Sequence, residues 1–209
     1  TEEGKALLEK AMITQAEVDA QAEKINSAYA ALVKLSATPE TTTYLSDLTE
    51  TKHEVAYNCF HKNAANIENG SSGKITLVVN GEAQEFKKGV FTHAPAKVWY
   101  DIGGKGFEVF EAYVGVDHAK PSQGNIVFRV YGDGELLYES KPSGNGSQES
   151  QRFSIPIASV KELLIETDDC GSDNGDWGDW ADAKFLTYPD NSKSVTGITV
   201  NGKALPDFR

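Results

Sequence analysis

The sequence predicts an all-β sandwich preceded by a short N-terminal helical hairpin. Three observations lead to this prediction. Between residues 74 and 188, about eight short runs rich in β-branched and aromatic residues follow one another at regular spacing. Two of their connections carry strong turn signals, at Asn80-Gly81 and at residues 132–134. No clear helical run interrupts these segments, and helical spacing of apolar residues is confined to the part before residue 36.

The first 35 residues have the pattern of two helices. Thr14 is a good N-cap with Glu17 three residues later, and an apolar stripe at helical spacing follows: Val18, Ala22, Ile25, Tyr29 and Leu32. The phrase TQAEVDAQAEKINSAYAALVKL resembles the second half of a FIVAR module, a small three-helix bundle of multimodular bacterial surface and secreted enzymes. We therefore expect residues 1–35 to be a partial FIVAR-like spacer and residues 36–43, SATPETTT, to be a linker.

From Tyr44 to Tyr188 the pattern is that of strands, and this range is the expected sandwich domain. The residues after Tyr188 begin with a second linker, PDNSKSV, and then restart with ITVNGKALPDF, a strand and an Asn-Gly turn. We expect residues 189–209 to be a linker and the start of a following β domain. The segments predicted as strands are 74–80, 82–91, 96–102, 107–117, 125–140 with its internal turn, 151–157, 160–169 and 180–188.

The charge of the chain limits its partners. With 20 Lys and Arg against 31 Asp and Glu, the formal net charge is -11. Nucleic acids and anionic membrane surfaces need a basic footprint, which this composition does not supply. No apolar run approaches the roughly 20 residues of a membrane span, and there is no signal peptide. Met12 is the only methionine, so we expect a fragment excised from a larger protein.

The chain has two cysteines, Cys59 and Cys170. Two are too few for a disulfide scaffold or a thiolate zinc site. They lie near the two ends of the expected β domain, where the first and last strands of a sandwich often lie side by side. A single disulfide and two free thiols are both compatible with the sequence.

The most unusual segment is 168–185, DDCGSDNGDWGDWADAKF, which combines six aspartates, three glycines and two tryptophans. Asp, Asn and Gly favour turns, whereas Trp carries a large apolar area that a free loop rarely leaves in water. A ring beside carboxylates suits a sugar, because the ring stacks on C–H groups while the carboxylates accept hydrogen bonds from hydroxyls. Aspartate oxygens also suit calcium. A third interpretation has one Trp in the core and the carboxylates solvated.

Five phrases, in order, resemble the NPCBM family, which is carbohydrate-binding module family 51. They are YLSDL, FKKGVFTHAPAKVWYDIGG, FEAYVGVD, VFRVYGDGELLYES and DWADAKF, spread over about 140 residues. The resemblance implies a galactose-binding, discoidin-like jelly roll, non-catalytic and appended to bacterial glycoside hydrolases, with galactose-terminated ligands that include blood-group A and B antigens. It also implies a structural calcium. The chain departs from the family at His118, at Trp177, and in residues 57–69, which lack a Gly-Trp-Gly phrase.

The resemblance and the loop chemistry together select the candidate residues. We expect His93 to donate to a sugar hydroxyl such as the axial O4 of galactose. Trp177 is expected to be exposed for stacking, and Trp180 to lie in the core. Asp182 is the expected calcium ligand. The sugar-binding candidates are His93, Asp117, His118, Asp176, Trp177 and Asp179.

These features predict a non-catalytic, lectin-like module of a secreted or cell-surface bacterial glycoside hydrolase. Its expected ligands are glycans ending in galactose or N-acetylgalactosamine, of blood-group or mucin type. A glycosidase is one alternative, because Asp176, Asp179 and Asp182 are carboxylates, but a glycosidase needs its pair held across a cleft. A structural or protein-binding sandwich without sugar binding is the other alternative.

Overall fold

The computed structural model describes residues 39–67, 72–188, 199–200 and 203–204. The chain divides between Thr38 and Pro39. The predicted helical hairpin and FIVAR-like spacer, residues 1–35, lie outside the described residues.

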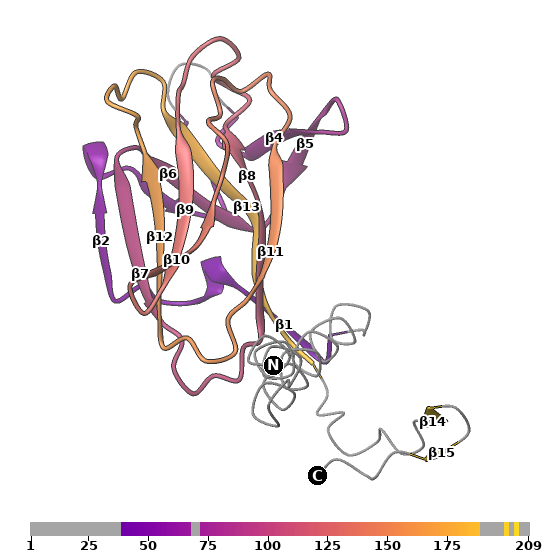
Figure 1. The fold of residues 1–209 in the computed structure, drawn as a ribbon. Helices are drawn as coiled ribbons and strands as arrows, with labels where there is room; N and C mark the ends of the chain where they lie inside the picture. The colour runs from indigo at the N-terminus through magenta and orange to yellow at the C-terminus, as the bar shows by residue number, and fades with distance from the viewer. Residues whose placement is uncertain (1–38, 68–71, 189–198, 201–202, 205–209) are drawn as a thin grey trace, which may run out of the picture. The chain divides into compact units, whose positions relative to one another are not determined.

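Two antiparallel sheets form a β-sandwich (Figure 1), which confirms the predicted all-β class. The first sheet has the order β11 (Gln151–Pro156), β8 (Val109–Val116), β13 (Trp177–Thr187), β6 (Gly89–His93) and β3 (Phe60–Lys62), and β1 (Thr41–Tyr44) also pairs with β13. The second sheet has the order β10 (Glu135–Glu139), β9 (Val127–Gly132), β12 (Glu162–Asp168), β7 (Ala96–Asp101) and β2 (Lys52–Val55).

The chain enters the sandwich earlier than the sequence analysis predicted. Residues 41–43, expected to end the linker, belong to β1, with Thr41 opposite Thr187 and Tyr44 opposite Lys184. Three consecutive threonines suit a strand because their branched side chains fit its pleated surface. The strands β2 and β3 were also not predicted, and two short 3-10 helices accompany them: η1 (Leu45–Asp47) and η2 (Ala56–Asn58).

The main core lies between the two sheets and is centred on Trp180, which is fully buried. Its indole ring meets Phe128 edge-on at a centroid distance of 5.1 Å, and its Nε1–H donates to Thr167 Oγ1 at 3.1 Å. The buried N–H therefore has the partner it needs. The prediction that Trp180 is a core residue is confirmed.

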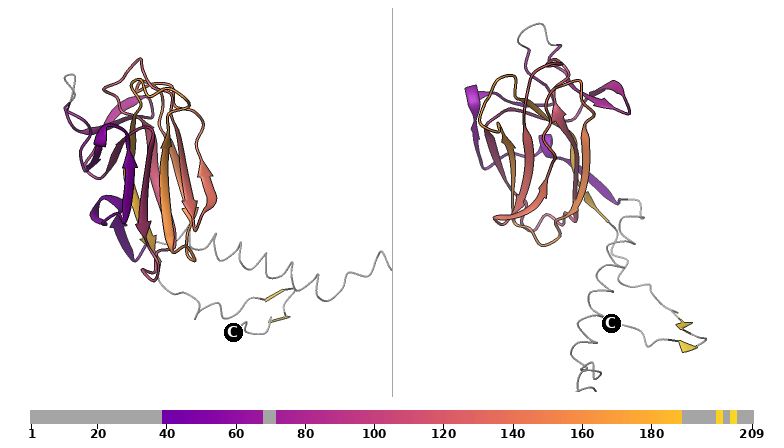
Figure 2. Two further views of the ribbon diagram at one scale, coloured as in Figure 1. Left: turned by 90° about the vertical axis from the view of Figure 1, so that its left-hand side faces the viewer. Right: turned by 45° about the horizontal axis from the view of Figure 1, so that its top comes forward.

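A second, smaller core lies on the outer face of the first sheet. The hairpin of β4 (Ile75–Val79) and β5 (Glu82–Phe86) belongs to neither sheet, and Ile75 and Leu77 pack with residues of β6 and β13. The first sheet leaves room for them at two glycines. A Cβ on Gly89 would lie 3.1 Å from Ile75 Cδ1, and a Cβ on Gly115 would lie 3.1 Å from Leu77 Cδ2. Figures 1 and 2 show this hairpin beside the sandwich.

The strand β13 begins at Trp177, three residues before the predicted start at Trp180. Trp177 lies opposite His93 and Asp179 opposite Phe91 on β6. Since side chains alternate along a strand, Trp177 and Asp179 point away from the face that carries Trp180. The predicted loop is therefore shorter, and the prediction that Trp177 is exposed is wrong, because only 2% of the residue is accessible.

The remaining described segments complete the fold. A two-stranded ladder joins β14 (Thr199–Val200) to β15 (Lys203–Ala204), where the sequence analysis predicted a strand followed by an Asn-Gly turn. Cys59 and Cys170 are not joined by a disulfide in the structure. In the described part of the chain no helix has the length and apolar character needed to cross a membrane.

The central position of Trp180 gives the first prediction. We expect Trp180→Ala to lower the free energy of unfolding by about 3–5 kcal/mol, because it leaves a large cavity and removes one of the hydrogen bonds of Thr167. Urea unfolding of both proteins measures the difference. Leu136→Ala is the control, since Leu136 is 52% exposed and should change stability by less than about 0.5 kcal/mol. Equal effects of the two substitutions would contradict the prediction.

Candidate binding site

A hollow of about 340 Å³ opens where η2, the end of β6 and the loops before β9 and β13 meet. These segments are far apart in the sequence and are joined by backbone hydrogen bonds. Ala94 N–H donates to the Asp176 carbonyl at 3.0 Å, and His93 N–H donates to the Cys59 carbonyl at 3.1 Å. The lining combines aromatic, polar and charged groups: Tyr57, Cys59, Asn66, His93, Lys120, Asp173, Asn174, Gly175 and Trp177.

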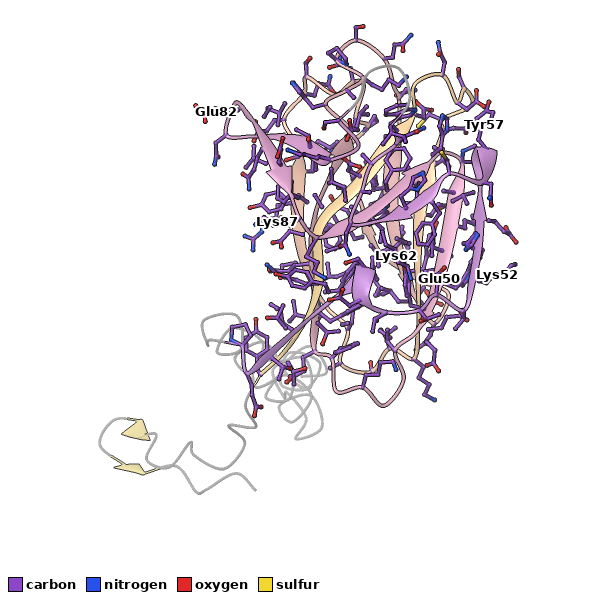
Figure 3. All side chains as sticks on the ribbon, turned by 180° about the vertical axis from the view of Figure 1, so that it is seen from behind. Glu50, Lys52, Tyr57, Lys62, Glu82 and Lys87 are labelled. Atoms are coloured by element: carbon purple, nitrogen blue, oxygen red, sulfur yellow. The ribbon has the colours of Figure 1, made fainter. Side chains whose placement is uncertain are left out.

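Tyr57 presents its ring at the rim of the hollow and is 71% exposed. Figure 3 shows it on the opposite side of the sandwich from the tip of the β4–β5 hairpin, which Glu82 marks. The hydroxyl donates to Asp173 Oδ2 at 2.6 Å, and the ring meets His93 edge-on at 4.8 Å. Tyr57 and Asn58 both have left-handed backbones, with φ of 56° and 54°. Such conformations are rare for bulky residues and are common at binding sites.

His93 forms part of the hollow, as predicted, but its hydrogen bonding differs from the prediction. Its Nδ1 lies 2.9 Å from the Ala94 carbonyl oxygen. A carbonyl only accepts, so Nδ1 must carry the proton and Nε2 of the neutral imidazole has a lone pair. Within the described residues Nε2 has no hydrogen-bond partner. A neutral His93 would thus accept a hydrogen bond from a hydroxyl, instead of donating one.

Trp177 lies at the base of the hollow, enclosed on two sides. The ring packs edge-on against Phe91 at 5.7 Å, and Lys120 Nζ lies 4.1 Å from the ring centroid. The lysine therefore covers the indole face that the sequence analysis expected to stack on a sugar. Tyr57, which was not predicted, is the aromatic residue that presents its ring to solvent here.

Asp176 is buried behind the hollow. Its Oδ1 accepts from the backbone N–H of Asn125 at 2.7 Å, whereas Oδ2 has no partner. Burial raises the pKa of Asp176 to about 6, although the Asn125 hydrogen bond and the nearby His93 act in the opposite direction. The side chain joins two loops and does not face the hollow.

Asp179 is fully buried between Phe91 and Gly115, under the β4–β5 hairpin. Neither of its carboxylate oxygens accepts a hydrogen bond from an N–H or hydroxyl group. Burial raises its pKa well above the usual range, and the negative charge of the neighbouring Asp117 carboxyl acts in the same direction.

Asp117 and His118 face a second hollow, of about 370 Å³, between the hairpin and the loop that follows β8. Asp117 accepts from Ala119 N–H at 2.8 Å and Thr76 N–H at 3.4 Å, and His118 Nδ1 lies 3.0 Å from the Gly146 carbonyl. The six predicted sugar-binding residues therefore do not form one site. His93 and Trp177 line the first hollow, Asp117 and His118 line the second, and Asp176 and Asp179 line neither.

Asp182, the expected calcium ligand, lies beside Lys184 on β13. Its carboxylate pairs with Lys184 Nζ at 2.7 Å, at a bulge in β13 where Asp182 has a φ of 51°. Among the described residues no group of three or more acidic, His or Cys side chains is arranged to hold a metal. The calcium itself stays a prediction. Removing it with a chelator should lower the Tm if it is bound, and an unchanged Tm would contradict it.

The fold and the phrases that carry the resemblance now have independent support. Residues 41–186 match the NPCBM/NEW2 domain. The chain belongs to this family. NPCBM domains are non-catalytic carbohydrate-binding modules found as ancillary domains of glycoside hydrolases, and this module is therefore not an enzyme. The burial of Asp176 and Asp179 agrees with this conclusion, since carboxylates of a glycosidase must reach their substrate.

Relatives of known structure share the sandwich. The CBM51 of a Clostridium perfringens GH95 protein, solved with methyl-galactose, is 32% identical with a TM-score of 0.63, over 69% of this chain and 99% of that one. CBM51-2 with the INT domains of C. perfringens ZmpB, solved with GlcNAc, is 28% identical with a TM-score of 0.65, over 74% of this chain and 33% of that one.

A curated relative from Renibacterium salmoninarum bears the name "Putative endo-alpha-N-acetylgalactosaminidase". It is 33% identical over 126 residues, which make up 60% of this chain and 8% of that protein. The module therefore matches a small part of a much longer relative.

The buried carboxyl of Asp176 gives a prediction about pH. Its pKa in the folded protein, about 6, exceeds its ordinary value of 3.8, so the folded state binds the proton more tightly. Stability should fall as the pH rises from about 4 to 6. We expect Asp176→Asn to increase the free energy of unfolding at pH 7 by at most about 3 kcal/mol and to have little effect below pH 4.

Urea unfolding at pH 4 and pH 7 measures this difference. Glu135→Gln is the matched control, since Glu135 is exposed on β10. An Asp176→Asn protein that is less stable than the wild type at pH 7 would contradict the prediction.

Proposed function

We propose that this module binds glycans ending in galactose or N-acetylgalactosamine in the hollow of Tyr57, His93 and Trp177. The observation that carries the proposal is the exposed Tyr57 ring held at its edge against a buried imidazole. A stacking ring beside a fixed hydrogen-bonding group is the arrangement that recognises one face of a pyranose. The similar CBM51 solved with methyl-galactose supports a galactose ligand.

His93 supplies the discrimination between galactose and its epimers. Its Nδ1–H is held by the Ala94 carbonyl, so the ring orientation is fixed and Nε2 is left as an acceptor. The axial hydroxyl at C4 of galactose would donate to Nε2, whereas the equatorial hydroxyl of glucose points elsewhere. Asn66 and Asn174, also in the lining, offer amide groups to the remaining hydroxyls.

The proposed role of the module is to hold a secreted or cell-surface bacterial glycoside hydrolase on mucin-type or blood-group glycans. The long relative named for an N-acetylgalactosaminidase supports such a parent protein. One binding event keeps the catalytic domain close to further substrate, which raises its effective concentration without any new catalytic contact.

A glycan array tests the proposal. We expect binding to termini carrying galactose or N-acetylgalactosamine and weak binding to glucose and GlcNAc termini. Binding to none of the galactosyl or N-acetylgalactosaminyl termini would overturn the proposal and favour a structural or protein-interaction role. Preferential binding to GlcNAc would overturn the proposed specificity while retaining sugar binding.

Tyr57 provides the sharpest test of where the sugar binds. We expect Tyr57→Ala to weaken binding of methyl-galactose by roughly five- to tenfold, which corresponds to the loss of about 1 kcal/mol from stacking. Tyr57→Phe keeps the ring but loses the hydrogen bond to Asp173, so it should retain most of the affinity. Isothermal titration calorimetry measures all three proteins.

Leu136→Ala is the control for this measurement, because Leu136 is an exposed apolar residue on β10 and lies outside the hollow. Its affinity should equal that of the wild type. Unchanged binding by a folded Tyr57→Ala protein would place the sugar elsewhere.

A further inference from the structure

Backbone hydrogen bonds within its loop hold the main chain of Lys120, a residue that lines the hollow, in a fixed position. Its N–H donates to the Asp117 carbonyl at 2.9 Å, and its carbonyl accepts from Gly146 N–H at 2.8 Å. The side chain is half-buried and reaches across Trp177, with Nζ 4.1 Å from the ring centroid. The loop therefore directs this ammonium group to the base of the hollow.

The ammonium group of Lys120 has no carboxylate partner among the described residues. Lys120 is also the lysine that lines the hollow, where its ammonium group lies against the Trp177 ring. The only carboxylate that lines the hollow, Asp173, accepts the hydroxyl hydrogen of Tyr57. The contact with the indole leaves hydrogen-bond donors of the ammonium group unused.

We propose that Lys120 selects glycans whose galactose carries an anionic substituent, either a sulfate ester or an attached acidic sugar with its carboxylate. This inference rests on the proposed function, since it assigns a ligand class to the same hollow. An anion beside Lys120 would form a charge-assisted hydrogen bond in a partly enclosed site, where such bonds are stronger than in water. Asp173 and the buried Asp176 are carboxyl groups whose negative charge repels an anion. An anion would therefore bind on the Lys120 side of the hollow.

Calorimetry with three ligands tests this proposal: methyl-galactose, galactose 6-sulfate and 3′-sialyllactose. We expect the wild type to bind at least one of the two anionic ligands about tenfold more tightly than methyl-galactose. Lys120→Gln should remove this preference, and Lys120→Arg should retain most of it. The preference should also decrease as the salt concentration rises. Comparing the two anionic ligands shows whether the sulfate or the sugar carboxylate is the source of the charge.

Lys105→Gln is the matched control, because Lys105 is exposed and does not line the hollow. It should keep the wild-type preference. Binding of methyl-galactose without any anionic preference would overturn this proposal and leave the proposed function intact. A preference that survives in Lys120→Gln would also overturn it, and absence of binding to all three ligands would overturn both proposals.

Discussion

The central strand β13 controls the arrangement of the whole module, because it is hydrogen-bonded on both sides. With β6 on one edge and β8 on the other, a one-residue shift of its register would move every side chain to the opposite face. This register sends Trp180 into the main core and sends Trp177 and Asp179 outward. The β4–β5 hairpin then covers the outward face where Gly89 and Gly115 provide room for Ile75 and Leu77.

Much of the fold could be predicted from the sequence, since the strands from β4 to β12 alternate clearly and end at strong turn signals. The short strands β1, β2 and β3 could not, because three or four residues with mixed polarity carry little periodicity. The start of β13 was missed for another reason. Asp, Gly and Trp at its beginning have the composition of a loop, and only pairing with β6 and β8 makes them a strand.

The site was less predictable than the fold. His93 was found because it lies in a phrase of the family, and its neighbour Trp177 lies in the acidic segment. Tyr57 was missed because its role depends on a left-handed backbone and on contacts with Asp173, 116 residues away. An available signal was an aromatic residue in the stretch where the family has Gly-Trp-Gly. Asp117 and His118 are separated from His93 because Lys120, in the loop after β8, lies across Trp177. No local sequence pattern encodes this contact.

The pairing of β1 with the end of β13 has a consequence for the proposed role of the module as a tether. Thr41 lies opposite Thr187, so the polypeptide enters and leaves the sandwich at neighbouring points, whereas Tyr57 lies at the far end (Figures 1 and 3). A force that pulls a surface-bound glycan away from the rest of the protein therefore acts along the length of the strands. Strands loaded in this direction resist by shearing several hydrogen bonds together, which favours a durable anchor.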